Sequence, residues 1–203
     1  MNSINVAILY LGKPDLNKHY LRCNVFLSCG NVLDMTNHNT PETQFHKLLQ
    51  EQIRSEFTAT QQYTAIAVHF ASDDLPQLAK YFYRQAGEER EHAMKMVQYF
   101  IDRDFGVQIP GTDEVRNQFD TPRDAIALAL DLERTVTKQV SALAAAARGE
   151  GDYLGEQFMW WFLEEQIEEE AVLTTLLRVA ERAGDNLFDL EEFIARDVNS
   201  SSN

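Results

Sequence analysis

The sequence has little cysteine, few basic residues and no long hydrophobic run. Its two cysteines, Cys23 and Cys29, lie near the N-terminus, so neither a disulfide framework nor a cysteine-based zinc site supports the remaining chain. This distribution fits a reducing compartment, and we expect a cytoplasmic protein. No apolar run approaches the ~20 residues that span a bilayer, and no Lys or Arg precedes the short apolar stretch at 6–11. The sequence therefore predicts neither a membrane partner nor a signal peptide.

Basic residues are scarce relative to acidic ones. The 18 Lys and Arg against 32 Asp and Glu give a net charge of −14 over 203 residues. Phosphate binding needs a surplus of Lys and Arg, so we expect no nucleic acid as a direct partner. A charge of this sign attracts cations, although it also serves solubility alone. The length suits one domain with an appendage, and the apolar content suits a buried core.

Residues 1–40 differ from the rest of the chain. They mix short apolar pieces with Asn, Gly and Pro and show no sustained helical period. We treat them as an N-terminal extension of unknown role, before a domain at 41–198 and a polar tail at 199–203. Two explanations are open: a poorly ordered tail, or a biological start at Met35 with the preceding residues an artefact that is not part of the natural protein.

The chain after residue 40 shows the spacing of amphipathic helices. Long helices are expected at about 41–72, 75–103, 122–148 and 152–183, with a short fifth helix at 187–197. Thr40 and Thr121 are the predicted N-caps of the first and third, because each is followed by Pro at the first helical position. Between 104 and 121 the period lapses, and so long a connection implies a crossover along a bundle. The predicted fold is all-α, a four-helix bundle with one long crossover and a short C-terminal fifth helix.

Each long helix carries a glutamate within its apolar stripe: Glu56, Glu89, Glu133 and Glu169. Glu56 lies eleven residues after Phe45, and at ~100° per residue this spacing returns to within ~20° of the same helix face. His92 follows Glu89 by three residues and shares its face. Isolated buried carboxylates cost several kcal/mol, so cations among them are the simplest explanation. Carboxylates with one imidazole favour Fe, Mn or Zn, and a bridging carboxylate can hold two ions.

The same residues resemble the ferroxidase signature of the non-haem bacterial ferritins. The resemblance rests on Glu56 with Gln62-Tyr63, on Glu88-Glu89-x-x-His92, on Glu133, and on Glu165-Gln166-x-Glu168-Glu169. It covers residues 41–197, including the crossover and the fifth helix. It implies a ferritin-like fold, a homo-oligomeric shell of 24 subunits, oxidation of Fe(II) by dioxygen or hydrogen peroxide, and storage of ferric oxide inside the shell.

The resemblance also assigns roles to individual residues. Glu56, Glu89 and His92 would hold a first iron, and Glu89 would bridge to a second. The second iron would be held by Glu133 and Glu169, with Gln166 close by.

Further matches lie around this di-iron centre. Glu88, Glu165 and Glu168 match a third, more weakly held iron site of some bacterial ferritins. Tyr63 and Trp161 match aromatic residues that supply electrons or hydrogen bonds to the centre, and ordinary core packing is an equally open explanation for both.

The start of the fourth helix is acidic, with Glu150, Asp152 and Glu156, where ferritins form three-fold pores that guide Fe(II) inward. Bacterioferritins usually carry a second Glu-x-x-His on this helix and a Met that ligates haem. The matching position here reads Gln166-x-x-Glu169, so we expect no haem.

Two other classes of protein stay open at this stage. One is a different di-iron bundle enzyme, such as a rubrerythrin-like peroxidase or an oxygenase of organic substrates. Rubrerythrins often carry a cysteine-rich rubredoxin module, which the sequence lacks. The other is a helical bundle without metal chemistry, which the four inward carboxylates disfavour.

Overall fold

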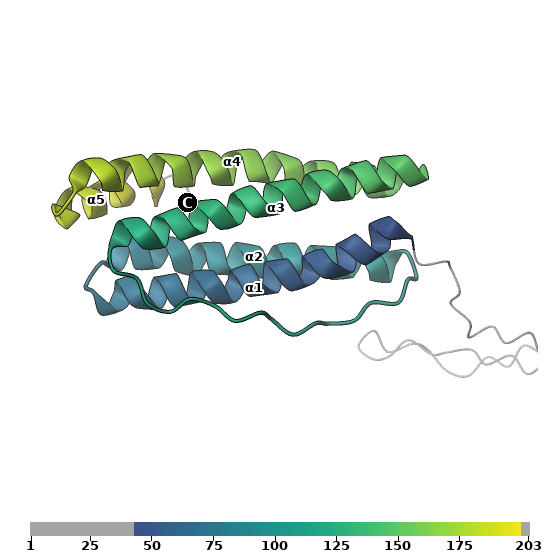
Figure 1. Ribbon diagram of the computed structural model, residues 1–203, viewed down its shortest axis with the longest axis horizontal. Coiled ribbons are helices and arrows are strands. Elements are labelled where there is room, and N and C mark those ends of the chain that lie inside the picture. Colours follow the sequence, from purple (N-terminus) through teal and green to yellow (C-terminus); the bar gives the residue numbers. More distant parts are fainter. Residues whose placement is uncertain (1–42, 200–203) are drawn as a thin grey trace, which may run out of the picture. The chain divides into compact units, whose positions relative to one another are not determined.

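The computed structural model describes residues 43–199, and this part of the chain is helical without strands (Figure 1). The elements are α1 (Gln44–Ser72), α2 (Pro76–Asp102), α3 (Pro122–Glu150), α4 (Tyr153–Ala183), α5 (Leu187–Phe193) and a π-helical turn, η1 (Ile194–Val198). The predicted all-α class and bundle architecture are confirmed. The predictions for residues 1–40, with Cys23, Cys29 and Met35, lie outside the described residues, as does most of the tail.

The four long helices form two antiparallel pairs. α1 packs along α2, α3 packs along α4, and α1 also contacts α3. Residues 103–121 run along the bundle from the end of α2 to the start of α3, as the sequence predicted (Figure 1). Two glutamines of α1 hold this crossover: Gln50 exchanges hydrogen bonds of 2.6 and 3.1 Å with the backbone of Gln108, and Gln62 exchanges bonds of 2.7 and 2.8 Å with that of Arg116.

Local capping decides where the helices begin. α1 starts three residues later than predicted, because Thr43 and not Thr40 is its N-cap, accepting a hydrogen bond of 3.2 Å from the backbone N–H of His46. Thr121 caps α3 as predicted, at 3.2 Å from the N–H of Asp124. α3 ends at Glu150, and its C-cap, Gly151, adopts a φ of 73° that a residue with a Cβ rarely adopts.

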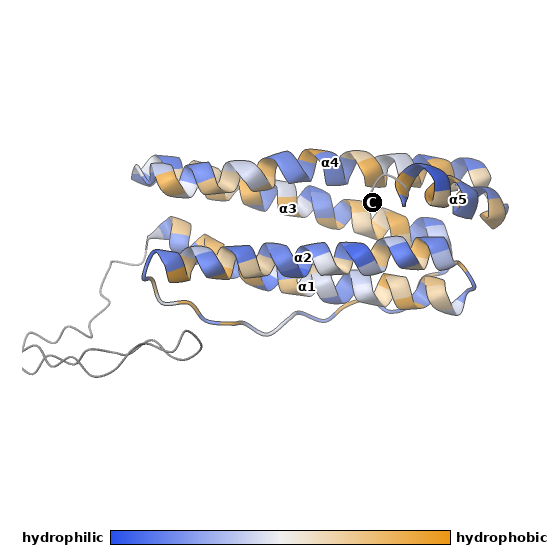
Figure 2. Cartoon of the chain, turned by 180° about the vertical axis from the view of Figure 1, so that it is seen from behind, coloured by the Kyte–Doolittle hydropathy of each residue, from blue (hydrophilic) through white to orange (hydrophobic). Residues whose placement is uncertain are grey.

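Hydrophobic and hydrophilic residues alternate along every helix (Figure 2), and the buried apolar residues form two separate clusters. The first cluster, around Tyr63, Phe82 and Leu173, lies toward one end of the bundle. The second, around Ile53, Met96 and Phe162, lies toward the other. Each long helix passes from one cluster to the other, and the stripe glutamates lie at the four crossing points. The four stripe glutamates therefore lie between the two apolar clusters.

The short fifth helix packs on the bundle beside the start of α2. The Glu191 carboxylate accepts hydrogen bonds of 2.8 Å from the backbone N–H groups of both Gln77 and Leu78. Asn199 donates to the backbone carbonyl of Gln77 at 3.1 Å. Over residues 43–199, no helix has the length and apolarity to cross a membrane.

Candidate metal centre

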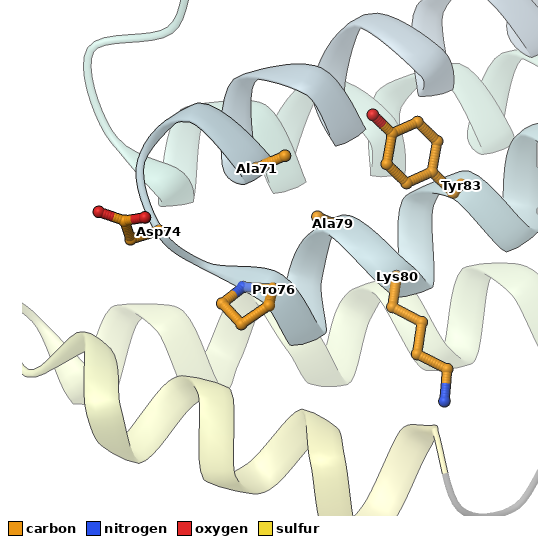
Figure 3. Close-up of a pocket in the computed structure, with 6 residues that line it drawn as sticks. All are labelled: Ala71, Asp74, Pro76, Ala79, Lys80 and Tyr83. Carbon is orange, nitrogen blue, oxygen red and sulfur yellow. The ribbon is translucent and has the colours of Figure 1, made fainter.

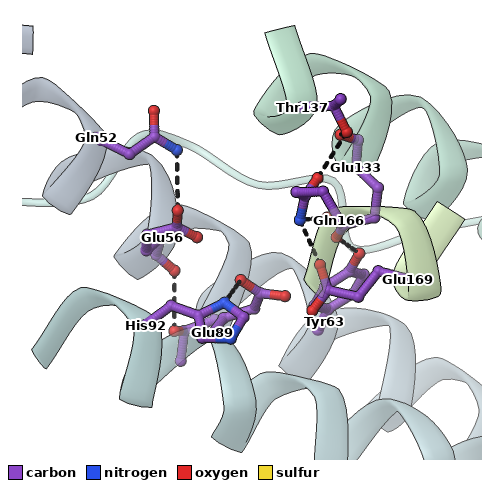
Figure 4. Close-up of polar contacts among 10 residues, drawn as sticks. Gln52, Glu56, Tyr63, Glu89, His92, Glu133, Thr137, Gln166 and Glu169 are labelled. Carbon is purple, nitrogen blue, oxygen red and sulfur yellow. Dashed lines mark hydrogen bonds and ion pairs between the residues drawn. The ribbon is translucent and has the colours of Figure 1, made fainter. Parts of the chain in front are cut away.

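Five metal-capable side chains from the four long helices meet between the two apolar clusters (Figure 4). Glu56 of α1 meets Glu89 and His92 of α2, with one ligand atom of each within 4.8 Å of the others. Glu89 also meets Glu133 of α3 and Glu169 of α4 within the same distance. Glu89 thus belongs to two groups of three, which is the arrangement that a carboxylate bridging two metal ions requires.

The carboxyl groups of this cluster are held away from water. Glu56, Glu89 and Glu133 are each 1% exposed. Burial raises the pKa of Glu56 to about 7 and the pKa of Glu169 to about 10. Burial, with the neighbouring carboxylates second, also raises the pKa of Glu89 well above its usual value. Burial raises the pKa of Glu133 in the same direction, although hydrogen bonds from Tyr63 and Gln166 oppose it. Without cations, the centre therefore retains protons at neutral pH.

His92 is the one imidazole of the cluster. Burial, and then the nearby Lys95 charge, lower the pKa of His92 to about 4, so the ring is neutral near pH 7. Its Nδ1 lies 3.4 Å from Glu89 Oε2. This contact is not an ion pair, because the imidazole carries no charge. A neutral imidazole beside a carboxylate is the form in which both ligate a metal.

Two carboxylate oxygens test whether the centre fits a cation. Glu56 Oε2 and Glu89 Oε1 are buried, and no amide, amine or hydroxyl group of the described chain hydrogen-bonds to either. Burial raises the pKa of both carboxyl groups, which favours retention of a proton on the pair. Unpaired buried carboxylates are costly, and a divalent cation in place of that proton would satisfy both oxygens. The residues therefore fit a metal.

Amide and hydroxyl groups surround the carboxylates and fix their orientation (Figure 4). Gln52 Nε2 donates to Glu56 Oε1 at 2.9 Å. The Tyr63 hydroxyl donates to Glu133, and Gln166 Nε2 donates to Glu133 Oε2 at 3.0 Å. Gln166 Nε2 also donates to Glu169. Tyr63 and Gln166, two residues singled out from the sequence, therefore hold the Glu133 and Glu169 side of the cluster.

The sequence analysis missed three members of this polar shell. Gln52 lies four residues before Glu56 on the same face of α1. Thr137 lies four residues after Glu133 and contacts Gln166 Oε1 at 2.8 Å and Glu170 Oε1 at 2.5 Å. Both Gln52 and Thr137 could have been found by searching for polar residues one helical turn from each predicted ligand. Glu170, the third member, is half-buried and lies against the Thr137 hydroxyl.

Trp161 lies at the outer side of His92. The two rings meet edge to face, with centroids 5.4 Å apart and an interplanar angle of 83°. Phe162 contacts both rings, at 5.7 Å from His92 and 4.8 Å from Trp161. The ring of His92 is therefore held by two aromatic neighbours from α4, while Tyr63 lies on the Glu133 side of the cluster.

The three residues proposed for a third iron site are placed differently. Glu88 and Glu165 are half-buried and Glu168 is exposed. Within residues 43–199, the closely spaced metal-capable groups are the two that share Glu89, and these three glutamates do not form another. Arg84, 3.6 Å from Glu88, partly offsets its charge.

The acidic residues at the α3–α4 turn all have partners within the chain. Glu150 accepts hydrogen bonds from the N–H groups that begin α1, at 2.7 and 3.3 Å. Asp152 is the N-cap of α4, accepting from the Gly155 N–H at 3.0 Å. Glu156 pairs with Arg148 at 2.5 and 2.8 Å. Each carboxylate therefore has a partner within the chain, and their place in an iron-uptake pore stays a prediction.

Comparison with known proteins shows the family of the chain. The model of the ferritin family, described as a ferritin-like domain, matches residues 46–183. The chain belongs to the ferritin family. A protein of Mycobacterium tuberculosis, named Ferritin BfrB or Bacterioferritin BfrB according to strain, is 68% identical over 164 residues, covering 81% of this chain and 91% of that protein.

More distant ferritins also match the chain. The Bacterial non-heme ferritin of Staphylococcus aureus is 31% identical over 138 residues, covering 68% of this chain and 83% of that protein. An open pore ferritin of the archaeon Archaeoglobus fulgidus superposes with a TM-score of 0.72 at 27% identity, covering 75% of this chain and 94% of that one. The names of these ferritins include both bacterioferritin and non-heme ferritin, so the absence of haem stays a prediction.

Proposed function

We propose that this ferritin stores iron and acts as a ferroxidase, oxidising Fe(II) to Fe(III) at a di-iron centre within each subunit. One observation carries the proposal: Glu89 belongs to two groups of ligands at once, each with ligand atoms within 4.8 Å. A single buried ion would not require carboxylates from all four helices. Two adjacent ions sharing one carboxylate explain why all five side chains converge.

The roles of the residues follow from their positions. Glu56 and His92 would bind one Fe(II), Glu133 and Glu169 the other, and Glu89 would bridge them. Binding displaces the protons that burial retains on the carboxyl groups, since a metal ligand must be deprotonated. Hard carboxylate oxygens favour Fe(III) over Fe(II), which draws the oxidation forward. Each Fe(II) loses one electron, and one dioxygen takes up two electrons and two protons to give hydrogen peroxide, itself a second oxidant.

Assembly into a closed 24-subunit shell is part of the proposal. Several large apolar side chains of the described bundle are exposed, among them Tyr153 at 76%, Ile167 at 72% and Tyr83 at 49%. Tyr83 also lines a shallow groove with Pro76 and Ala79, beside the turn between α1 and α2 (Figure 3). Exposed apolar surface of this kind suits contacts between identical copies. A cytoplasmic location and a centre without haem complete the proposal.

Aerobic oxidation of Fe(II) by the purified full chain tests the function. We expect fast formation of ferric absorbance at about two Fe(II) per chain, slower mineral growth with more iron, and no Soret band. Size-exclusion mass should correspond to the shell, and electron microscopy should show iron cores. A small assembly that reduces peroxide and forms no core would support the rubrerythrin-like alternative instead.

A further inference from the structure

A lysine ammonium lies against the face of the tryptophan beside the candidate centre. Lys95 Nζ is 3.0 Å from the centroid of the Trp161 ring. Lys95 belongs to α2 and Trp161 to α4, so this contact joins the two helices across the bundle. Partial desolvation also lowers the pKa of Lys95, although the carboxylates of Glu165 and Glu91 oppose that effect. The Lys95 ammonium therefore lies against the Trp161 indole, although a chain with a net charge of −14 offers it many carboxylates as partners.

Trp161 lies between this charge and a candidate iron ligand. Its indole meets His92 edge to face at 5.4 Å between centroids, and His92 is 5% exposed. The order from the surface inward is therefore Lys95, Trp161, His92. Only one ring, that of His92, separates the Trp161 indole from the candidate iron centre. Of the three aromatic side chains here, His92, Phe162 and Trp161, the indole is the one most easily oxidised by one electron.

A positive charge at an aromatic face changes the energy of oxidation. The cation is attracted by the electron-rich face of the neutral ring. When the indole loses an electron it becomes a radical cation, and this attraction turns into repulsion at the same short distance. We propose that Lys95 protects Trp161 from one-electron oxidation, acting as a positioning residue that holds a positive charge against the indole.

Tyr63 lies beside a carboxylate, whereas Trp161 lies beside a cation. It is 1% exposed, lies on the Glu133 side of the centre, and donates its hydroxyl hydrogen to the Glu133 carboxylate. Among residues 43–199, no cation–π contact involves the Tyr63 ring. An electron can leave Tyr63 together with a proton that the carboxylate accepts, whereas an electron leaving Trp161 must do so beside a fixed positive charge. The surroundings of the two aromatic residues therefore favour loss of an electron from Tyr63 over loss of an electron from Trp161.

The protection has a chemical purpose that rests on the proposed function. Two Fe(II) supply two electrons to dioxygen, and the hydrogen peroxide formed can take two more, giving water with two further protons. When iron is exhausted, peroxide must draw electrons from the protein. Oxidation of Trp161 would remove one electron from the indole and then its Nε1 proton, and would damage the packing that holds His92. Lys95 disfavours that first electron loss.

The test uses the metal-free full chain, so that it does not depend on ferroxidase activity. A Trp160→Phe background leaves Trp161 as the only tryptophan, since the chain has two. Hexachloroiridate(IV) takes one electron from the indole, and loss of indole fluorescence gives the rate. We expect Lys95→Met to raise this rate roughly tenfold, the factor that about 1.4 kcal/mol represents. Because the oxidant is an anion, loss of Lys95 slows its approach, so a faster reaction reports the indole itself.

Two control variants separate the local charge from other effects. Lys95→Arg keeps the cation and should react as the parent does. Lys80→Met removes an exposed lysine elsewhere on α2 and should leave the rate unchanged. An unchanged rate in Lys95→Met, or an equal rise in Lys80→Met, would overturn the inference. A parallel measurement of aerobic Fe(II) oxidation decides the proposed function separately, because the metal-free rates stand whether or not the protein oxidises iron.

Discussion

The Oγ1 of Thr137 lies 2.8 Å from the Oε1 of Gln166 and 2.5 Å from the Oε1 of Glu170, and its single hydrogen is available to either oxygen. When the hydroxyl donates to Gln166, it holds the amide oxygen, and the amide turns its Nε2 toward Glu133 Oε2 at 3.0 Å and toward Glu169. A reversed amide would place an oxygen against two carboxylates. Thr137 therefore orients two candidate ligands without touching either carboxylate.

Thr137→Val should weaken the Glu133–Glu169 side of the centre selectively. The variant keeps the shape of the side chain and removes the hydroxyl, so Gln166 loses the bond that sets its orientation. One hydrogen bond contributes about 1 kcal/mol, so we expect roughly fivefold weaker binding of the second metal ion and unchanged binding of the first. Anaerobic titration with Co(II) separates the two steps. Thr137→Ser should restore the parent affinity, and equal weakening of both steps would contradict this assignment.

Glu89 and Glu169 should differ in how many metal ions their loss removes. Glu89 belongs to both ligand groups and Glu169 to only one. We therefore expect Glu89→Ala to abolish tight binding of both ions, and Glu169→Ala to retain about one per chain. Calorimetry with Zn(II), which has no redox chemistry, gives the number directly. Retention of one tight ion by Glu89→Ala would exclude a bridging role. Both variants should lose at least about 100-fold in the rate of Fe(II) oxidation.

The metal-free protein should lose stability as the pH rises from about 5 to 8. The pKa of Glu56 is about 7 in the folded chain against an ordinary 4.5, so between these values the folded state holds a proton that the unfolded state has lost. The unfolding free energy then falls with increasing pH, on the order of 3 kcal/mol for this one buried group. Glu169, with a pKa of about 10, continues the fall to higher pH.

The protonation of His92 changes the stability in the opposite direction. Its pKa of about 4 lies below the ordinary 6.5, so its contribution to stability rises with pH between these values. The opposite contributions of the buried carboxyl groups to the unfolding free energy are together larger than that of His92. Thermal unfolding of metal-free protein at fixed ionic strength measures the net slope, which Glu56→Gln should flatten. Added Zn(II) should reverse the trend, because metal binding is favoured by deprotonation. A rising stability without metal would show that the carboxylates are already paired.

The burial of the candidate ligand glutamates could be predicted from the sequence because its signal is local. Glu56 and Glu133 stand where the helical period requires apolar residues, and burial follows from that period alone. The supporting residues gave a weaker signal, since Gln52 and Thr137 are ordinary polar residues until their partners on other helices are known.

The start of α1 also depends on a contact that is distant in the sequence. The sequence placed the start of α1 at Thr40 from a Thr-Pro pair, but the structure uses Thr43 together with the Glu150 carboxylate. Glu150 lies 106 residues from Gln44 along the chain. No local pattern predicts such a contact, because it exists only after α1 and α3 have packed.

Glu191 is the second carboxylate that completes a distant helix, and it should determine how firmly α5 is held. The N-cap residue of α2, Leu75, makes no side-chain hydrogen bond, and Pro76 has no N–H to satisfy. The Glu191 carboxylate instead accepts from Gln77 and Leu78 at 2.8 Å each, next to the positive end of the helix dipole. Glu191→Ala should therefore lower stability by about 1–2 kcal/mol, the usual range for a lost cap.

Denaturant unfolding and hydrogen exchange test this role together. The amides of Gln77 and Leu78 should exchange faster in Glu191→Ala, while amides in the middle of α2 keep their protection. Glu192→Ala is the matched control, since it removes a neighbouring exposed carboxylate of α5 and should change neither measurement. Faster exchange throughout α2 would mean that Glu191 supports the whole helix and not only its first turn. Unchanged exchange at both amides would show that the α2 terminus holds without α5.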